Sequence, residues 1–211
     1  MKVTRGAMAG AEDLFRKGVE LFRQKRLDNA ARAFLDAIEI DPDHANSIAF
    51  LAGVRAIKKE YKLARDYAKK ALAIDAKNAM AHLTLGKILD EKDKDVTGAV
   101  QAFERAVALD PLLVDAWFNI GQIKYNQHDW DGAIEAFGHV TQIDPSDKGA
   151  ADFLDLARKS RERDLQKIER EAQEQEFHEH AREAHERERA FAALSANAER
   201  ILDHITIPFF T

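Results

Sequence analysis

Three histidines lie close together in the second half of the chain: His178, His180 and His185. Neutral imidazoles are common ligands of zinc. A zinc protease helix carries His-Glu-x-x-His, but the position that needs the second histidine after His178 is occupied by Arg182, and no two of the three histidines are four residues apart. We interpret them as solvent-exposed side chains on a charged helix and predict no metal ligands.

A second arrangement resembles a calcium loop in its spacing. Asp93, Asp95, Thr97 and Gly98 are followed six residues later by Glu104. Threonine is a poor ligand here, and a calcium loop must curve around its ion, whereas the residues after Gly98 fall in a segment that the repeat described below requires to be helical. We interpret the segment as a turn with one inserted residue.

Other catalytic signatures are absent. The sequence has no phosphate-binding loop, no dinucleotide glycine fingerprint and no G-x-S-x-G, and it has no cysteine to serve as a nucleophile or a zinc ligand. We therefore predict that the protein is not an enzyme and needs no cofactor.

Small residues, aromatic residues and prolines recur every 34 or 35 residues along most of the chain. Within each repeat the apolar residues follow helical spacing in two successive segments, which predicts two amphipathic helices per repeat. Proline ends the second helix in three of the repeats, since it cannot continue a helical ladder. The recurring residues are Gly18, Ala30, Phe34, Ala37 and Pro42; Ala52, Ala64, Ala68, Ala71 and Ala76; Gly86, Ala99, Phe103, Ala106 and Pro111; and Gly121, Ala133, Phe137, Val140 and Pro145.

The fourth repeat resembles the tetratricopeptide repeat family. It matches the family pattern at Trp117, Ile120, Gly121, Ala133, Phe137 and Pro145, while Lys124 stands where the family has tyrosine. The resemblance covers residues 11–147 and implies an all-α, right-handed superhelical solenoid of four helical hairpins. The expected hairpins are residues 11–44, 45–78, 79–113 and 114–147.

The remaining segments flank this stack. Residues 1–10 are expected to be a loose leader or a remnant of cloning. Residues 148–160 carry a narrow apolar stripe that predicts a capping helix, made by Ala150, Phe153, Leu154 and Ala157. Residues 161–190 predict a long charged helix, which either stays single or pairs as a coiled coil through a weak heptad.

In proteins of this family the first helices line a concave face that holds a peptide, and the resemblance implies such a groove here. Apolar residues exceed what packing between the helices needs at its amino end, and polar residues dominate its carboxyl end. The predicted partner-binding residues are Phe15, Val19, Phe22, Phe50, Ile57, Met80, Leu83, Lys87, Phe118, Asn119, Gln122 and Tyr125. About half of them are expected to pack within their own hairpin.

A variant of the family clamps the acidic carboxyl terminus of heat-shock chaperones with lysine and asparagine. The matching positions here are Phe15, Val19, Phe50, Met80 and Thr84, so the clamp is missing. We predict a non-catalytic adaptor that binds an apolar or amphipathic protein segment. The alternative is a chaperone that shields a secretion or assembly client in the same groove.

Residues 191–211 predict an amphipathic tail. Its apolar side chains are expected to dock in the groove of the same chain or of a second copy, which makes a homodimer one outcome. They are Phe191, Leu194, Ile201, Leu202, Ile205, Phe209 and Phe210.

Composition limits the partners and the location. The net charge of -5 disfavours nucleic acid, which is bound mainly through clustered lysine and arginine. The sequence shows neither the apolar core of a signal peptide nor a run long enough to span a membrane. We expect a cytoplasmic protein.

Overall fold

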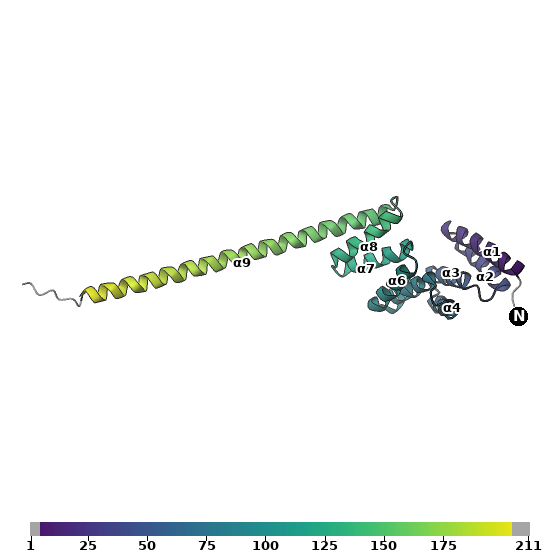
Figure 1. Cartoon of the computed structure of the whole chain (residues 1–211), viewed down its shortest axis with the longest axis horizontal. Coiled ribbons are helices and arrows are strands. Elements are labelled where there is room, and N and C mark those ends of the chain that lie inside the picture. Colours follow the sequence, from purple (N-terminus) through teal and green to yellow (C-terminus); the bar gives the residue numbers. More distant parts are fainter. Residues whose placement is uncertain (1–4, 204–211) are drawn as a thin grey trace, which may run out of the picture. The chain divides into compact units, whose positions relative to one another are not determined.

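The computed structural model describes residues 5–203 and places side chains from residue 8 to residue 200. All regular structure in this range is helical, and Figure 1 shows the helices in chain order. Eight of them form four hairpins: α1 (Arg5–Arg23) with α2 (Leu27–Ile40), α3 (Ala45–Ile57) with α4 (Tyr61–Ile74), α5 (Ala79–Ile88) with α6 (Val96–Leu109), and α7 (Val114–Asn126) with α8 (Trp130–Ile143). The long helix α9 (Lys148–Asp203) follows.

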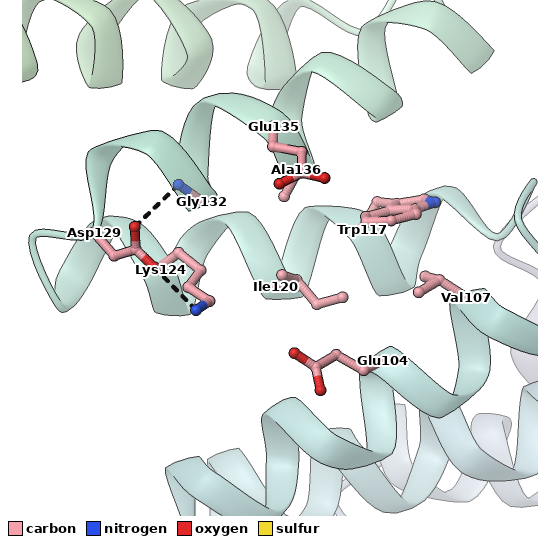
Figure 2. A pocket seen from close by; sticks show the side chains of 9 residues that line it. All are labelled: Glu104, Val107, Trp117, Ile120, Lys124, Asp129, Gly132, Glu135 and Ala136. Atoms are coloured by element: carbon pink, nitrogen blue, oxygen red, sulfur yellow. Dashed lines mark hydrogen bonds and ion pairs between the residues drawn. The ribbon is translucent and has the colours of Figure 1, made fainter.

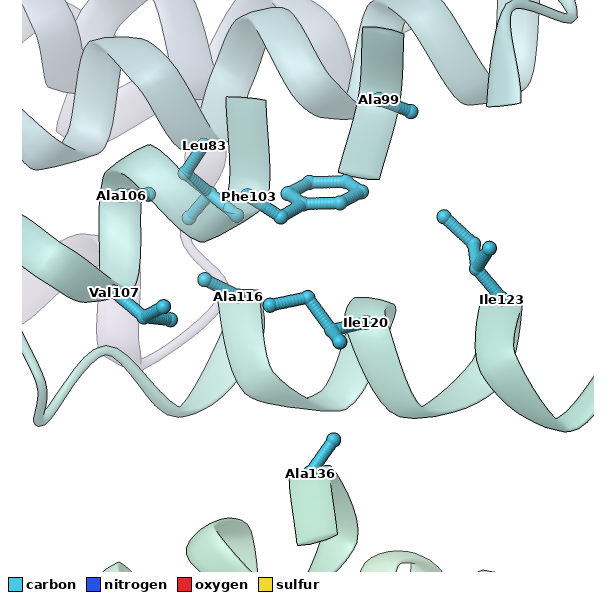
Figure 3. Close-up of a cluster of buried hydrophobic side chains, with 9 residues drawn as sticks. All are labelled: Leu83, Ala99, Phe103, Ala106, Val107, Ala116, Ile120, Ile123 and Ala136. Carbon is cyan, nitrogen blue, oxygen red and sulfur yellow. The ribbon is translucent and has the colours of Figure 1, made fainter. Parts of the chain in front are cut away.

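The hairpins stack in chain order. Each first helix packs on its own second helix, and α2, α4 and α6 pack on the first helix of the next hairpin. Figure 3 shows one such junction, where Phe103 and Val107 of α6 meet Ile120 and Ile123 of α7. The predicted all-α solenoid is confirmed. The chain divides into two compact units, Met1–Arg158 and Lys159–Thr211, so the stack includes the first residues of α9.

A glycine on the first helix faces a phenylalanine ring on the second helix in three of the hairpins. The pairs are Gly18–Phe34, Gly86–Phe103 and Gly121–Phe137, and each ring is fully buried. A β-carbon at Gly121 would lie 2.8 Å from Cε1 of Phe137, closer than two carbon atoms approach without displacement. Glycine is therefore required so that the ring can lie against the helix backbone.

The second hairpin has two small residues at the positions of this contact. Ala52 takes the glycine position and Ala68 takes the phenylalanine position, and both are fully buried. A methyl group on the first helix is tolerated here because no ring approaches it. Two departures of the second repeat from the family pattern therefore belong together: alanine replaces the glycine on the first helix, and alanine replaces the phenylalanine that would contact it on the second.

Each hairpin turns through one residue in the left-handed region, at Lys25, Lys59, Lys94 and His128, with φ between 58° and 61°. In three hairpins the next N–H bonds to the carbonyl five residues earlier, as Arg26 does to Leu21, which is the Schellman closure of a helix. The third hairpin contains the extra residue, and there the Asp95 N–H reaches back six residues to the Leu89 carbonyl. The insertion widens the last turn of the first helix into the π-helical segment η1 (Leu89–Asp93).

An aspartate ends every second helix, at Asp41, Asp75, Asp110 and Asp144. Its Oδ1 accepts a hydrogen bond from the N–H two residues later, and its carbonyl accepts one from the N–H three residues later. The turn after Asp75 forms in this way although Ala76 replaces the proline found in the other repeats. The aspartate, rather than the proline, is the constant feature of the inter-repeat turn.

The outer surfaces of the two end units carry polar residues at the positions that are apolar and buried between hairpins. Ala116, Ile120 and Ile123 of α7 are buried against α6, whereas the corresponding residues of α1 are the exposed Asp13, Lys17 and Glu20. At the other end, the predicted capping stripe is buried against the fourth hairpin, with Ala150 and Ala157 fully covered and Phe153 and Leu154 half-covered. Position 155, which corresponds to the buried Ala52, holds an exposed aspartate, and no further helix of residues 5–203 packs there.

Two expectations about the flanking segments are modified. α1 begins at Arg5, so most of the predicted loose leader is helical. α9 is one helix of 56 residues, about 84 Å long at about 1.5 Å per residue, without a separate capping helix. Its side chains from residue 161 to residue 200 are all exposed, and i,i+4 ion pairs such as Arg187–Glu183 lie along it. Within residues 5–203 no helix is both long enough and apolar enough to cross a bilayer.

The glycine contacts lead to a test in which one substitution has opposite effects at two sites. Gly121→Ala should lower the free energy of unfolding by about 1–3 kcal/mol, because the methyl group displaces the Phe137 ring. Gly138→Ala should raise it by up to about 1 kcal/mol, because nothing lies within 4 Å of a β-carbon there and alanine favours a helix. Urea denaturation measures both. Equal effects at the two sites would show that the ring contact does not limit residue 121.

Candidate functional site

The predicted groove residues lie on α1, α3, α5 and α7, the first helices of the four hairpins. Ile57 is the most exposed of them, at 47%. The half-buried ones are Phe15, Val19, Phe22, Phe50, Met80, Lys87, Phe118, Asn119, Gln122 and Tyr125. Leu83 must be corrected: it is only 2% exposed and packs in the cluster of Figure 3, because α5 buries a wide stripe between its neighbours.

Four phenylalanine rings form what we term the first aromatic cluster: Phe15, Phe22, Phe34 and Phe50. Phe50 comes from α3, and its ring centroid lies 5.3 Å from that of Phe15, 5.8 Å from Phe22 and 5.6 Å from Phe34. These separations are typical of attractive edge-to-face contacts. Phe50 therefore joins the first two hairpins, and its substitution would affect folding as well as any binding.

The second aromatic cluster repeats the first one three repeats later. It comprises Phe118, Tyr125, Phe137 and Phe153. Phe153 of α9 takes the place of Phe50, with its centroid 5.8 Å from Phe118 and 5.2 Å from Phe137. In the hairpins between the two clusters one corresponding position holds a phenylalanine, the fully buried Phe103, and the others hold small, aliphatic or polar residues, among them Ala49, Ala68, Leu83 and Thr84. Partly exposed aromatic rings are thus concentrated on the first helices near both ends of the stack.

One ion pair connects the first helices of the third and fourth hairpins, and other polar side chains bond within their own helix. Lys87 Nζ lies 2.9 Å from Asp115 Oδ2, and the Asn119 amide donates to the Asp115 carbonyl. Thr84 is buried and donates to the Met80 carbonyl. Most of the polar groups predicted at this end therefore already have partners within the stack, although Asn119 and Gln122 stay half-exposed.

A separate concave feature lies between α6, α7 and α8, and we call it the α6–α8 cleft (Figure 2). Its volume is about 410 Å³. The apolar lining residues are Val107, Trp117, Ile120, Gly132 and Ala136, and the charged ones are Glu104, Lys124, Asp129 and Glu135. One face of Trp117 stacks on His139 with a centroid distance of 4.1 Å.

The charged groups at one end of the cleft neutralise each other. Lys124 Nζ lies 2.9 Å from Asp129 Oδ2, while Asp129 Oδ1 caps α8 by accepting from the Gly132 N–H at 3.0 Å. The hydrogen bond from Lys124, together with the one from Gly132, lowers the pKa of the Asp129 carboxyl below its usual value. The sequence analysis did not identify this cleft. The one feature of the sequence that pointed to it was Lys124, which stands where the family has tyrosine.

The acidic residues considered as calcium ligands have other roles. Asp93 pairs with Arg65, and Asp95 caps α6 through the Gly98 N–H. Glu104 lines the α6–α8 cleft. The three clustered histidines are exposed on α9, and the described part of the chain holds no group of three His, Cys, Asp or Glu side chains arranged for a metal.

Comparison with known proteins agrees with this geometry. The model of the tetratricopeptide repeat family matches residues 11–44 and 114–147, which are the first and fourth hairpins. The chain contains tetratricopeptide repeats. Its second and third repeats share the hairpin architecture although the family model does not match them.

Relatives and solved structures extend the likeness. The protein is 29% identical over 161 residues to DnaJ protein P58IPK homolog B of Oryza sativa subsp. japonica, covering 67% of this chain and 34% of that relative. The chain thus spans about a third of the length of such curated relatives. A structure of pilF from Pseudomonas aeruginosa aligns at a TM-score of 0.61 and 27% identity, covering 75% of this chain and 72% of that one. A MamA crystal structure, at a TM-score of 0.51, 24% identity and coverage of 72% and 82%, shares the fold.

The depressed pKa of Asp129 predicts how its tetratricopeptide hairpin responds to acid. A carboxyl whose folded pKa lies below its unfolded value of about 3.9 adds stability at neutral pH, and that stability is lost as the pH falls through the folded pKa. Asp129→Asn keeps a capping oxygen but removes the charge. The variant should be up to about 1 kcal/mol less stable than wild type at pH 7, because the pair with Lys124 is partly exposed, and the difference should shrink below about pH 4.

Urea denaturation at a series of pH values measures this difference. Asp95→Asn is the matched control, because Asp95 caps α6 in the same way but forms no lysine pair among the described residues. A stability difference for Asp129→Asn that stays constant between pH 7 and pH 3 would contradict the assigned role of the charge.

Proposed function

We propose that this tetratricopeptide repeat protein is a non-catalytic adaptor that binds a segment of a partner protein on the face formed by α1, α3, α5 and α7. Tetratricopeptide repeats form protein-interaction scaffolds, and the two aromatic clusters carry the more specific proposal. Apart from the buried Phe34 and Phe137, their rings are half-covered by the stack, which leaves apolar surface near both ends of the face. Aromatic side chains in such positions supply much of the energy of protein interfaces.

The chemistry of the face favours an apolar or amphipathic segment as the ligand. Between the clusters lie small or aliphatic residues, and Lys87 is already paired with Asp115. An acidic tail would require unpaired lysine side chains along the face. The positions that supply them in the chaperone-binding variant of the family hold apolar residues or threonine here. We therefore propose that apolar anchors of the partner contact the two clusters while its polar groups lie over the third and fourth hairpins.

The second candidate is a chaperone that uses the same face to shield a secretion or assembly client. The DnaJ names of several relatives favour it, although those relatives are about three times as long as the matched region. An adaptor binds a folded partner reversibly at one-to-one stoichiometry. A chaperone suppresses aggregation of its client and keeps it partly unfolded, so light scattering by a client with and without this protein separates the two roles.

Two exposed aliphatic residues of the second hairpin test the proposed face. Ile57 is 47% exposed on α3, and Leu63 is 39% exposed on α4. Ile57→Glu should weaken binding of peptides selected on the full chain from a displayed library by about tenfold or more, a loss of roughly 1.4 kcal/mol or more, because a charge then enters an apolar contact. Leu63→Glu should bind as wild type does.

Fluorescence anisotropy with labelled peptides measures the affinities, and circular dichroism establishes that both variants remain folded. Peptides that bind both variants equally well, or that lose binding only with Leu63→Glu, would place the ligand elsewhere.

We also propose that the carboxyl-terminal tail competes for this face or joins two copies. Phe191 and Leu194 are 72% and 70% exposed on α9, so they carry apolar surface without cover. The side chains of Ile201 and Leu202, and Ile205, Phe209 and Phe210 as a whole, lie outside the described residues. Burial of each large apolar side chain in a partner surface is worth roughly 1.5–3 kcal/mol.

Deletion of residues 191–211 should convert any dimer to a monomer and tighten peptide binding. Without the tail, the peptide no longer competes with it for the groove. Multi-angle light scattering measures the mass, and the anisotropy assay measures the affinity. An unchanged mass together with an unchanged affinity would show that the tail neither dimerises the protein nor occupies the groove.

A further inference from the structure

We propose that the α6–α8 cleft binds an arginine side chain of a partner protein. This cleft is built from residues other than those of the proposed peptide-binding face, so the two proposals stand or fall separately. Three observations carry it: the cleft has an apolar floor with an aromatic wall, two glutamates line it from different helices, and an equivalent cleft in the first hairpin carries the opposite charge.

The floor and wall suit the long apolar stem and the flat end of an arginine. Ile120 and Ala136 are buried at the bottom of the cleft, and Trp117 stands at one end of it (Figure 2). The Trp117 Nε1–H donates to the Pro111 carbonyl at 3.0 Å, and its ring stacks on His139, so the indole is fixed in position. A guanidinium group stacks favourably against such a ring.

The charges leave the cleft with a net negative lining. Lys124 and Asp129 neutralise each other at 2.9 Å. Glu104 of α6 and Glu135 of α8 are exposed, line the cleft from different helices, and have no ion-pair partner among the described residues (Figure 2). A guanidinium between them would meet one carboxylate from each helix, and arginine makes such fork-like contacts better than lysine does.

The equivalent cleft of the first hairpin shows that the repeat fold does not impose this charge. That cleft, of about 350 Å³, is lined by residues of the first hairpin that lie three repeats before those of α7 and α8, and it has no counterpart of Glu104 and Val107 on α6. Arg26 replaces Asp129 and Arg32 replaces Glu135, while Leu14 replaces Trp117. The part of the cleft formed by one hairpin is therefore basic and without an aromatic wall in the first hairpin, and acidic with an aromatic wall in the fourth.

The test uses the full chain and two tripeptides, acetyl-Ala-Arg-Ala-amide and the same peptide with citrulline, which has the shape of arginine but no charge. Peptide at millimolar concentration should shift the Trp117 indole N–H resonance in a saturable way, and the citrulline peptide should not. The Glu104→Gln, Glu135→Gln double variant should bind the arginine peptide at least fivefold more weakly. The control double variant Glu39→Gln, Glu169→Gln removes two exposed charges elsewhere and should bind as wild type does.

Three results would overturn the proposal: no saturable shift with wild type, equal shifts from the citrulline peptide, or unchanged affinity of the Glu104→Gln, Glu135→Gln variant with its fold intact by circular dichroism. A third peptide, acetyl-Ala-Lys-Ala-amide, compares the two cations, and preference for it would retain a cation site but overturn the assignment to arginine. An equal loss of affinity in the control variant would show that the overall charge of the protein, and not the two glutamates of the cleft, causes the effect.

Discussion

The contact between a helix backbone and a phenylalanine ring sets the geometry of the hairpins. Phe34, Phe103 and Phe137 lie against a glycine of the partner helix, and the second hairpin has Ala52 and Ala68 at the same positions. Because the core is close-packed, the separation of the two helices follows from the volume of this pair. Each of α2, α4 and α6 then packs on the first helix of the next hairpin, and the positions on the first helices become equivalent from repeat to repeat.

Much of this architecture could be predicted from the sequence because it repeats. The spacing of Gly18, Phe34 and their counterparts predicted four hairpins, and the stripe containing Ala150 and Ala157 predicted a cap. The π-helical turn could not be predicted, since an inserted residue can equally lengthen a loop. The structure places it in the last turn of the first helix, where Lys94 keeps the left-handed position that Lys25, Lys59 and His128 occupy elsewhere.

The candidate sites were harder to predict than the fold, for a physical reason. A helix inside a stack touches its own partner, the preceding hairpin and the following one, so its apolar surface is wider than a single stripe. Periodicity shows that Leu83 and Phe50 are apolar but not which neighbour covers them. Leu83 is buried in the core and Phe50 joins two hairpins, whereas Ile57 is left exposed. The α6–α8 cleft arises from three helices, and no single segment of the sequence describes it.

The aromatic clusters would couple the proposed binding to stability. Phe15, Phe22 and Phe118 are half-buried, so the same rings stabilise the ends of the stack and offer apolar surface to a ligand. In a stack of this kind each hairpin is stabilised mainly by its neighbours, and the end hairpins have a neighbour on one side only. A ligand that covers these rings binds the folded ends and not the unfolded chain, so it raises the stability of the hairpins that are least supported. A ligand bound at both ends would therefore also oppose the separation of the hairpins between them.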